Sequence, residues 1–97
     1  MKVIWSPLAI EKLEVIAKYI ALDKPSAAEK WINDVFDRAD LLASQPELGR
    51  EVPELLGSNY REVIFGNYRI IYKVGNKVNI LTLRNSRQLL SPDNIEL

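Results

Sequence analysis

The 97-residue chain contains no cysteine and no histidine, and these two absences exclude several kinds of site. Without cysteine there is no disulfide scaffold and no thiolate zinc site, so the fold has to be held by packing alone. Without histidine there is no imidazole to act as a general acid or base, to bind a metal or to complete a Ser-His-Asp triad. Any catalysis would have to use carboxylates, arginine, lysine or tyrosine.

Long apolar runs are also missing. No stretch approaches the roughly 20 apolar residues of a membrane span, and the apolar run before Ser6 is far too short for the apolar region of a signal peptide. We therefore expect a cytoplasmic protein with no membrane partner. The composition is 47% hydrophobic and 27% charged, which is enough for one hydrophobic core, and the length predicts a single domain over residues 1–97.

The net charge is zero, but the charges are unevenly distributed. Residues 1–49 hold 6 basic and 8 acidic side chains, a net charge of −2, whereas residues 50–88 hold 7 basic and 3 acidic, a net charge of +4. A basic later segment of this kind favours contact with an anionic partner.

Two helices are predicted in the first half of the chain. Residues 2–5 are typical of a short strand, and Ser6 with Pro7 forms an N-cap and first-turn pair that predicts a helix over about residues 7–22. Ser26, with a glutamate three residues later, resembles a capping box and predicts a second helix that ends near residue 44. Because the connection is so short, the two helices should form an antiparallel hairpin.

Periodic apolar positions give each predicted helix an inner face. These positions are Leu13, Ile16, Ala17 and Ile20 in the first helix, and Ala28, Trp31, Ile32, Val35, Ala39 and Leu42 in the second. The prolines and glycines that follow predict a loop up to about residue 59.

Three strands are predicted after this loop, over residues 60–65, 68–74 and 77–83. The Gly-Asn pairs that separate them suit two-residue type II′ turns, so the strands should form an antiparallel meander. The sequence therefore predicts an α+β domain with a short first strand, a helical hairpin, a three-stranded meander and an irregular C-terminal tail.

These turn lengths fix a register, with Phe65 opposite Tyr68 and Val74 opposite Lys77, and hence two faces of the sheet. The face expected to lie under the helices carries Arg61, Val63, Phe65, Tyr68, Ile70, Tyr72, Val74, Asn79, Leu81 and Leu83. The open face is expected to carry Tyr60, Glu62, Ile64, Arg69, Ile71, Lys73, Val78, Ile80, Thr82 and Arg84.

The order of these parts and three local strings resemble the RelE/ParE superfamily of bacterial type II toxins. The strings are WSPLAIEKLEVIAKYIALDKPSAAEKW, QPELGREVPEL and NYREVIFGNYRIIYKVGNKVNILTLRNSRQ, which together span nearly the whole chain. The resemblance implies a helical hairpin packed on a small, mainly antiparallel sheet. It also implies a toxin that is neutralised by a cognate antitoxin in a hetero-oligomeric complex and that needs no cofactor and no metal.

The resemblance implies one of two targets. RelE-like members are ribosome-dependent endoribonucleases that cut messenger RNA, whereas ParE-like members bind and poison DNA gyrase. RNA cleavage needs a proton acceptor, a proton donor and cations for the phosphate. The stretch RNSRQLLSPDNIEL contains neither tyrosine nor histidine, which nuclease members use near the end of the sheet. We therefore expect a ParE-like gyrase inhibitor with no catalytic residues.

Two other functions stay open. One is a nuclease, which would have to use Arg69, Arg61, Arg87, Glu62 and Tyr60. Direct binding of nucleic acid is expected only for this function. The other is a non-toxic relic that only binds its antitoxin. Arg69 with Glu62, diagonal in the expected register, is also expected as a purely structural cross-strand ion pair.

The resemblance also suggests binding surfaces. Target contacts are expected from the basic side chains Arg61, Arg69, Arg84 and Arg87. The antitoxin is expected to cover an apolar strip of the open face formed by Ile64, Ile71, Val78 and Ile80. Cover of this strip by the first strand or by the C-terminal tail of the same chain is the alternative.

Overall fold

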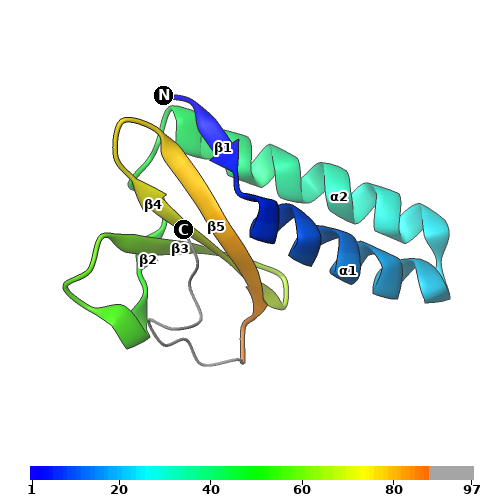
Figure 1. Ribbon diagram of the computed structural model, residues 1–97. Coiled ribbons are helices and arrows are strands. Elements are labelled where there is room, and N and C mark those ends of the chain that lie inside the picture. The colour runs from blue at the N-terminus through cyan, green and yellow to red at the C-terminus, as the bar shows by residue number, and fades with distance from the viewer. Residues whose placement is uncertain (88–97) are drawn as a thin grey trace.

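The computed structural model describes residues 1–87, and in it two antiparallel helices pack against one face of a five-stranded sheet (Figure 1). The predicted α+β class is confirmed. The elements are β1 (Val3–Trp5), α1 (Pro7–Asp23), α2 (Pro25–Asp40), the 3-10 turn η1 (Leu41–Ala43), β2 (Arg50–Glu51), the 3-10 turn η2 (Pro53–Leu55), β3 (Tyr60–Phe65), β4 (Tyr68–Val74) and β5 (Val78–Asn85). No helix of the described residues has the length and apolarity to cross a membrane.

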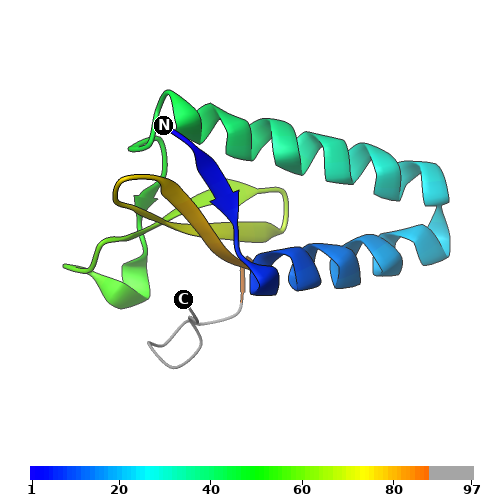
Figure 2. The same ribbon diagram turned by 45° about the horizontal axis from the view of Figure 1, so that its top comes forward.

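The strands lie in the order β1-β5-β4-β3-β2. The predicted meander is confirmed as the antiparallel centre of this sheet, formed by β3, β4 and β5. Two strands extend it. β1 runs parallel to β5, held by backbone bonds that include Val78 N to Lys2 O at 2.8 Å. β2 pairs with β3 and lies where the sequence predicted a loop (Figure 2).

Helix α1 begins at the predicted cap. The backbone N–H of Ala9 donates to Ser6 Oγ at 3.0 Å, and the same hydroxyl donates to the carbonyl of Leu81 at 2.8 Å. Ser6 therefore caps the helix and also ties it to β5.

Helix α2 begins two residues earlier than a cap at Ser26 predicts. Lys24 occupies the cap position without a side-chain cap bond, and Pro25 is the first helical residue. The predicted capping box at Ser26 is therefore wrong. Proline is favoured at the first helical position because its φ is already helical and it has no N–H to leave unpaired.

The main core lies between the helices and the sheet, and both predicted inner helix faces are confirmed. Its fully or nearly fully buried residues are Ala9, Leu13, Val35, Ala39, Leu42, Val63, Ile70, Tyr72, Val78, Ile80 and Leu83. Aromatic rings close its margins. Trp5 meets Phe36 edge-on at 4.9 Å between centroids, and Trp31 meets Tyr68 at 5.6 Å.

The second hairpin differs from the predicted register. Phe65 lies opposite Tyr68 as predicted, but Val74 lies opposite Val78, because the turn has three residues rather than two. A β-bulge then follows, since Tyr72 pairs with Ile80 and Ile71 with Thr82, which leaves Leu81 as the extra residue.

These two irregularities move four side chains to the opposite face. Val78 and Ile80 belong to the core under the helices, whereas Asn79 and Leu81 lie on the open face. Beyond the bulge the two shifts compensate, so Leu83 faces the helices as predicted.

The open face has a small cover of its own. Val52, Ile71 and Leu81 form a second buried cluster, with Leu55 and Tyr60 packed against it. The predicted antitoxin strip is therefore wrong as an exposed surface. Ile71, Val78 and Ile80 are completely buried, and of the four predicted residues only Ile64 is exposed.

Candidate functional site

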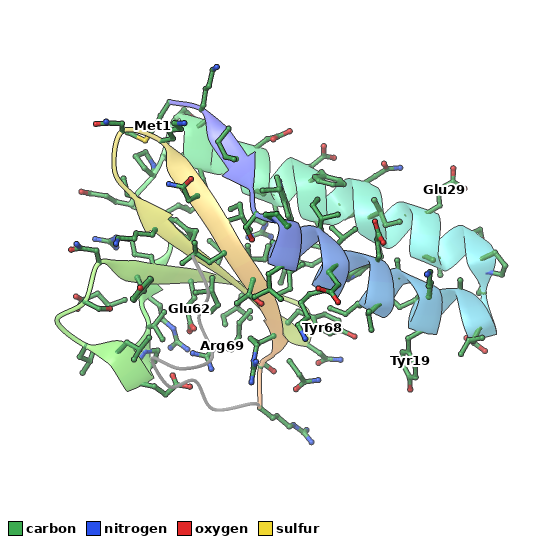
Figure 3. All side chains as sticks on the ribbon, in the orientation of Figure 1. Met1, Tyr19, Glu29, Glu62, Tyr68 and Arg69 are labelled. Atoms are coloured by element: carbon green, nitrogen blue, oxygen red, sulfur yellow. The ribbon has the colours of Figure 1, made fainter. Side chains whose placement is uncertain are left out.

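The open sheet face carries a chain of four charged side chains that lie in contact. Figure 3 labels its two central members, Glu62 and Arg69. Arg69 Nε donates to Glu62 Oε1 at 2.6 Å, and Arg50 Nε donates to Glu62 Oε2 at 2.8 Å. The other side of the Arg69 guanidinium forms two parallel bonds to Glu54, at 2.7 and 2.8 Å. The predicted pair of Arg69 with Glu62 is confirmed as the middle of this network.

Local structure explains why these side chains meet. Glu62 on β3 and Arg69 on β4 are diagonal neighbours, because Glu62 lies opposite Ile71 and Arg69 opposite Ile64. Arg50 lies directly opposite Glu62 across the β2–β3 ladder, and Glu54 comes from η2, which folds over the same face.

The two central members of this network are buried. Glu62 is 1% exposed and Arg69 is 4% exposed, so both charges are out of water. A buried charge is tolerated only when it is paired and hydrogen-bonded on most sides, as both are here. The hydrogen bonds to Glu54, followed by those to Glu62, raise the pKa of Arg69 against the opposing effect of burial.

Arg84 lies beside this network. It faces Arg69 directly across the β4–β5 ladder and is half-buried. Its Nε atom is the one buried side-chain nitrogen or oxygen among residues 1–87 that has no hydrogen-bond partner. Arg50, Arg69 and Arg84 stand against Glu54 and Glu62, so this part of the face carries three positive and two negative charges, a net charge of +1.

The other two predicted arginines lie apart from this network. Arg61 faces the helix side of the sheet at the start of β3, where its Nη1 donates to the carbonyl of Gly49 at 2.7 Å. Arg87 is exposed beyond the end of β5, with its backbone N–H bound to Asn85 Oδ1. The structure therefore brings Arg69 and Arg84 together and separates Arg61 and Arg87 from them.

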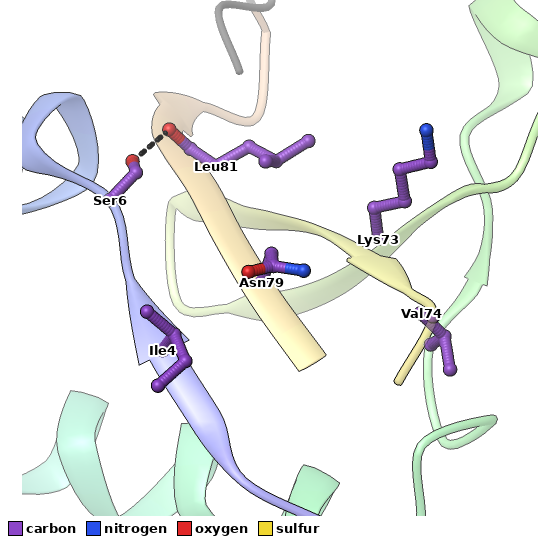
Figure 4. Close-up of a pocket in the computed structure, with 7 residues that line it drawn as sticks. Ile4, Ser6, Lys73, Val74, Asn79 and Leu81 are labelled. Carbon is purple, nitrogen blue, oxygen red and sulfur yellow. Dashed lines mark hydrogen bonds between the residues drawn. The ribbon is translucent and has the colours of Figure 1, made fainter. Parts of the chain in front are cut away.

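A shallow pocket occupies the rest of the open face, toward β1 (Figure 4). Its volume is about 380 Å³, and its wall is largely apolar, with Ser6, Asn79 and Lys73 as the polar members. Lys73 Nζ also lies 5.6 Å from the centroid of the Tyr60 ring. Ile4 is the exposed apolar residue of this wall.

The segment that carries Arg50 is held by a contact that the sequence did not indicate. The hydroxyl of Tyr72 accepts a bond from the Gly49 N–H at 2.9 Å and donates one to the Pro46 carbonyl at 2.8 Å. Burial raises the pKa of Tyr72. Because these partners are more than 20 positions away in the chain, only the folded structure reveals that Tyr72 positions the network.

This geometry favours binding over bond cleavage. Both oxygens of Glu62 are engaged by arginines and are buried, so this carboxylate is not placed to take a proton from a substrate hydroxyl. Arg69 holds its proton permanently and is a poor proton shuttle. What remains exposed is a set of cations and a small apolar pocket.

Comparisons with known proteins identify a family, a relative and a similar fold. The model of the family described as the ParE toxin of the type II toxin-antitoxin system parDE matches residues 3–90. The candidate toxin Y4kP of Sinorhizobium fredii is 33% identical over 86 residues, which cover 87% of this chain and 86% of that protein. A solved structure of the chromosomal ParDE toxin-antitoxin system from P. aeruginosa has a similar fold, with a TM-score of 0.74 and 21% identity over 88% of this chain and 95% of that one.

Proposed function

This chain belongs to the ParE toxin family of type II toxin-antitoxin systems, and from that membership we propose that it inhibits DNA gyrase by binding it and is neutralised by a cognate antitoxin. The proposed toxin acts by binding its target and does not catalyse a reaction. The observation that carries the choice of binding over RNA cleavage is the double engagement of the buried Glu62 carboxylate.

The proposal assigns different roles to the four predicted arginines. Arg69 is a positioning residue, because its guanidinium is buried against Glu54 and Glu62. Arg84 and Arg87 supply the target contacts, since Arg84 is half-buried near the end of β5 and Arg87 is exposed just beyond that strand. Arg61 supplies a contact at the edge of the target-binding surface. The irregular C-terminal tail that the sequence predicted falls on residues 88–97, which lie outside the described residues.

A supercoiling assay tests the target. Purified protein should block ATP-dependent supercoiling of relaxed plasmid by gyrase, and premixing it with its antitoxin should restore the activity. The R84A and R87A variants should each raise the inhibitory concentration by about tenfold, since each removes one charged contact. K77A changes an equally exposed cation in the turn before β5 and should inhibit like the parent.

Incubating the purified protein with ribosomes and messenger RNA distinguishes the gyrase inhibitor from the nuclease. Cleavage of the message by the purified protein, with gyrase untouched, would replace this proposal with the nuclease function. Normal growth of cells that accumulate soluble protein would indicate a non-toxic binding relic instead.

A further inference from the structure

Helix α1 carries a second apolar stripe on its solvent side. Val15, Tyr19 and Leu22 are 60%, 71% and 85% exposed and follow each other at intervals of four and three residues, so they lie in one row along the helix. Figure 3 shows Tyr19 pointing away from the body of the molecule. We define the outer stripe of α1 as Leu8, Glu11, Lys12, Val15, Lys18, Tyr19 and Leu22.

This stripe is additional to the one that builds the core. α1 already buries Ala9, Leu13 and Ala17 against α2 and the sheet, which is the single apolar face that a surface helix normally needs. A second row of large, exposed apolar side chains is therefore expected to have a partner.

The order of residues along the outer stripe is self-complementary about Val15. When a second copy of this stripe is laid antiparallel to the first, with a two-fold axis at Val15, that residue meets its own equivalent and Leu22 meets Leu8. Tyr19 of one copy then lies against Lys12 of the other, and Glu11 of one copy lies against Lys18 of the other. The two residues of each pair are offset by one position along the helix axis. Because the axis relates the two copies, every one of these unlike pairs forms twice.

We infer that the outer stripe of α1 is a dimer interface, in which a second copy of this chain docks its own α1 antiparallel across a two-fold axis near Val15. The stripe from Leu8 to Leu22 is about 21 Å long at the helical rise of 1.5 Å per residue. Apolar contacts form its centre and ends, and the charged pairs flank them.

Charge complementarity favours a second copy over another protein. Among the described residues, neither Glu11 nor Lys18 forms an ion pair, so both are available. An acidic partner would satisfy one of these charges and repel the other, whereas the antiparallel copy satisfies both. The same geometry places the aromatic ring of Tyr19 next to a lysine, which is a favourable arrangement.

The interface is small, so the dimer should be weak and depend on concentration. It also leaves the proposed target surface free, because the helices cover one face of the sheet and the charged network lies on the other (Figures 1 and 2). Dimerisation therefore goes beyond gyrase inhibition and does not depend on it.

Sedimentation velocity of the full chain, made by cell-free synthesis to avoid toxicity to a host, tests the inference. The parent protein should shift from monomer to dimer as its concentration rises. E11K and K18E should each dissociate about tenfold more readily, because each creates two like-charge contacts per dimer. An equimolar mixture of these two variants should dimerise again, since the heterodimer contains two unlike pairs.

Matched controls locate the interface. E29K, on the exposed surface of α2, and K77E, in the turn before β5, make the same charge changes elsewhere and should leave the dimer intact. The chain has no cysteine, so V15C provides a single thiol that should form a disulfide-linked dimer under mild oxidation much faster than E29C. A parent protein that stays monomeric throughout, or a mixture of E11K and K18E that fails to associate, would overturn the inference.

Discussion

Single residues set the geometry of the open face, and the clearest case is the pairing of Tyr72 with Gly49. The buried hydroxyl of Tyr72 fixes the segment before β2 through Gly49 and Pro46. The sequence indicated Tyr72 only as a core residue, because an aromatic at that position of a strand predicts burial without saying where its hydroxyl will bind.

Replacing Gly49 by alanine should destabilise the protein. A Cβ at this position would lie 2.5 Å from the backbone oxygen of Glu62 and 2.7 Å from the Tyr72 ring, so the backbone would have to shift. We expect a loss of about 2 kcal/mol in the free energy of unfolding, measured by urea denaturation. G75A is the control, because no atom lies within 4 Å of its added Cβ, and it should change stability by less than about 0.5 kcal/mol. Equal losses in the two variants would contradict this account.

The pairing of Arg69 with Glu62 shows what residue-scale patterns can predict. Strand positions alone gave the diagonal contact. They did not give its burial, since the cover comes from η2 and Val52, which lie in a segment whose prolines and glycines predicted only a loop. A single cross-strand pair worth about 0.2 to 1 kcal/mol was expected, and a four-member network with Glu62 and Arg69 buried at its centre was found.

The helices and central strands were predicted better than the pairing and register of the strands. The periodicity of apolar residues located both helices and the three central strands, because burial on one face imposes a regular spacing. β1 and β2 are only three and two residues long, and their pairing depends on distant strands, so no local pattern identifies them as sheet members. The three-residue turn and the bulge at Leu81 each insert one residue, and a Gly-Asn pair suits more than one turn length.

The caps of the two helices lead to an element-scale prediction. S6A removes the bond that caps α1 and the bond that ties it to Leu81, so it should lower the free energy of unfolding by about 1 to 2 kcal/mol. S26A changes the serine that resembles a cap but lies inside the first turn of α2, where the structure shows no side-chain cap bond, and it should be nearly neutral. Thermal denaturation of both variants would decide the point, and a larger loss in S26A would show that the cap assignment is reversed.

For the whole molecule, the main property is that the sheet has two unequal faces. The helices cover one face and form the main core with it, whereas the other has the small cluster around Val52, the charged network and the open pocket. The sequence predicted which layers exist, because the hairpin and the meander each have one apolar side. It misplaced Val78 and Ile80, since a single shift in strand register exchanges the faces.

Neighbouring residues of β1 test this asymmetry. Trp5 points to the helix side, where its ring packs against Phe36, whereas Ile4 points to the open face and is 40% exposed. W5A should therefore cost about 3 kcal/mol of unfolding free energy by leaving a cavity between β1 and α2, and I4A should cost less than about 1 kcal/mol. Urea titrations followed by far-UV circular dichroism measure both. Similar losses in the two variants would mean that both faces of β1 are equally packed and that the open face is covered in solution.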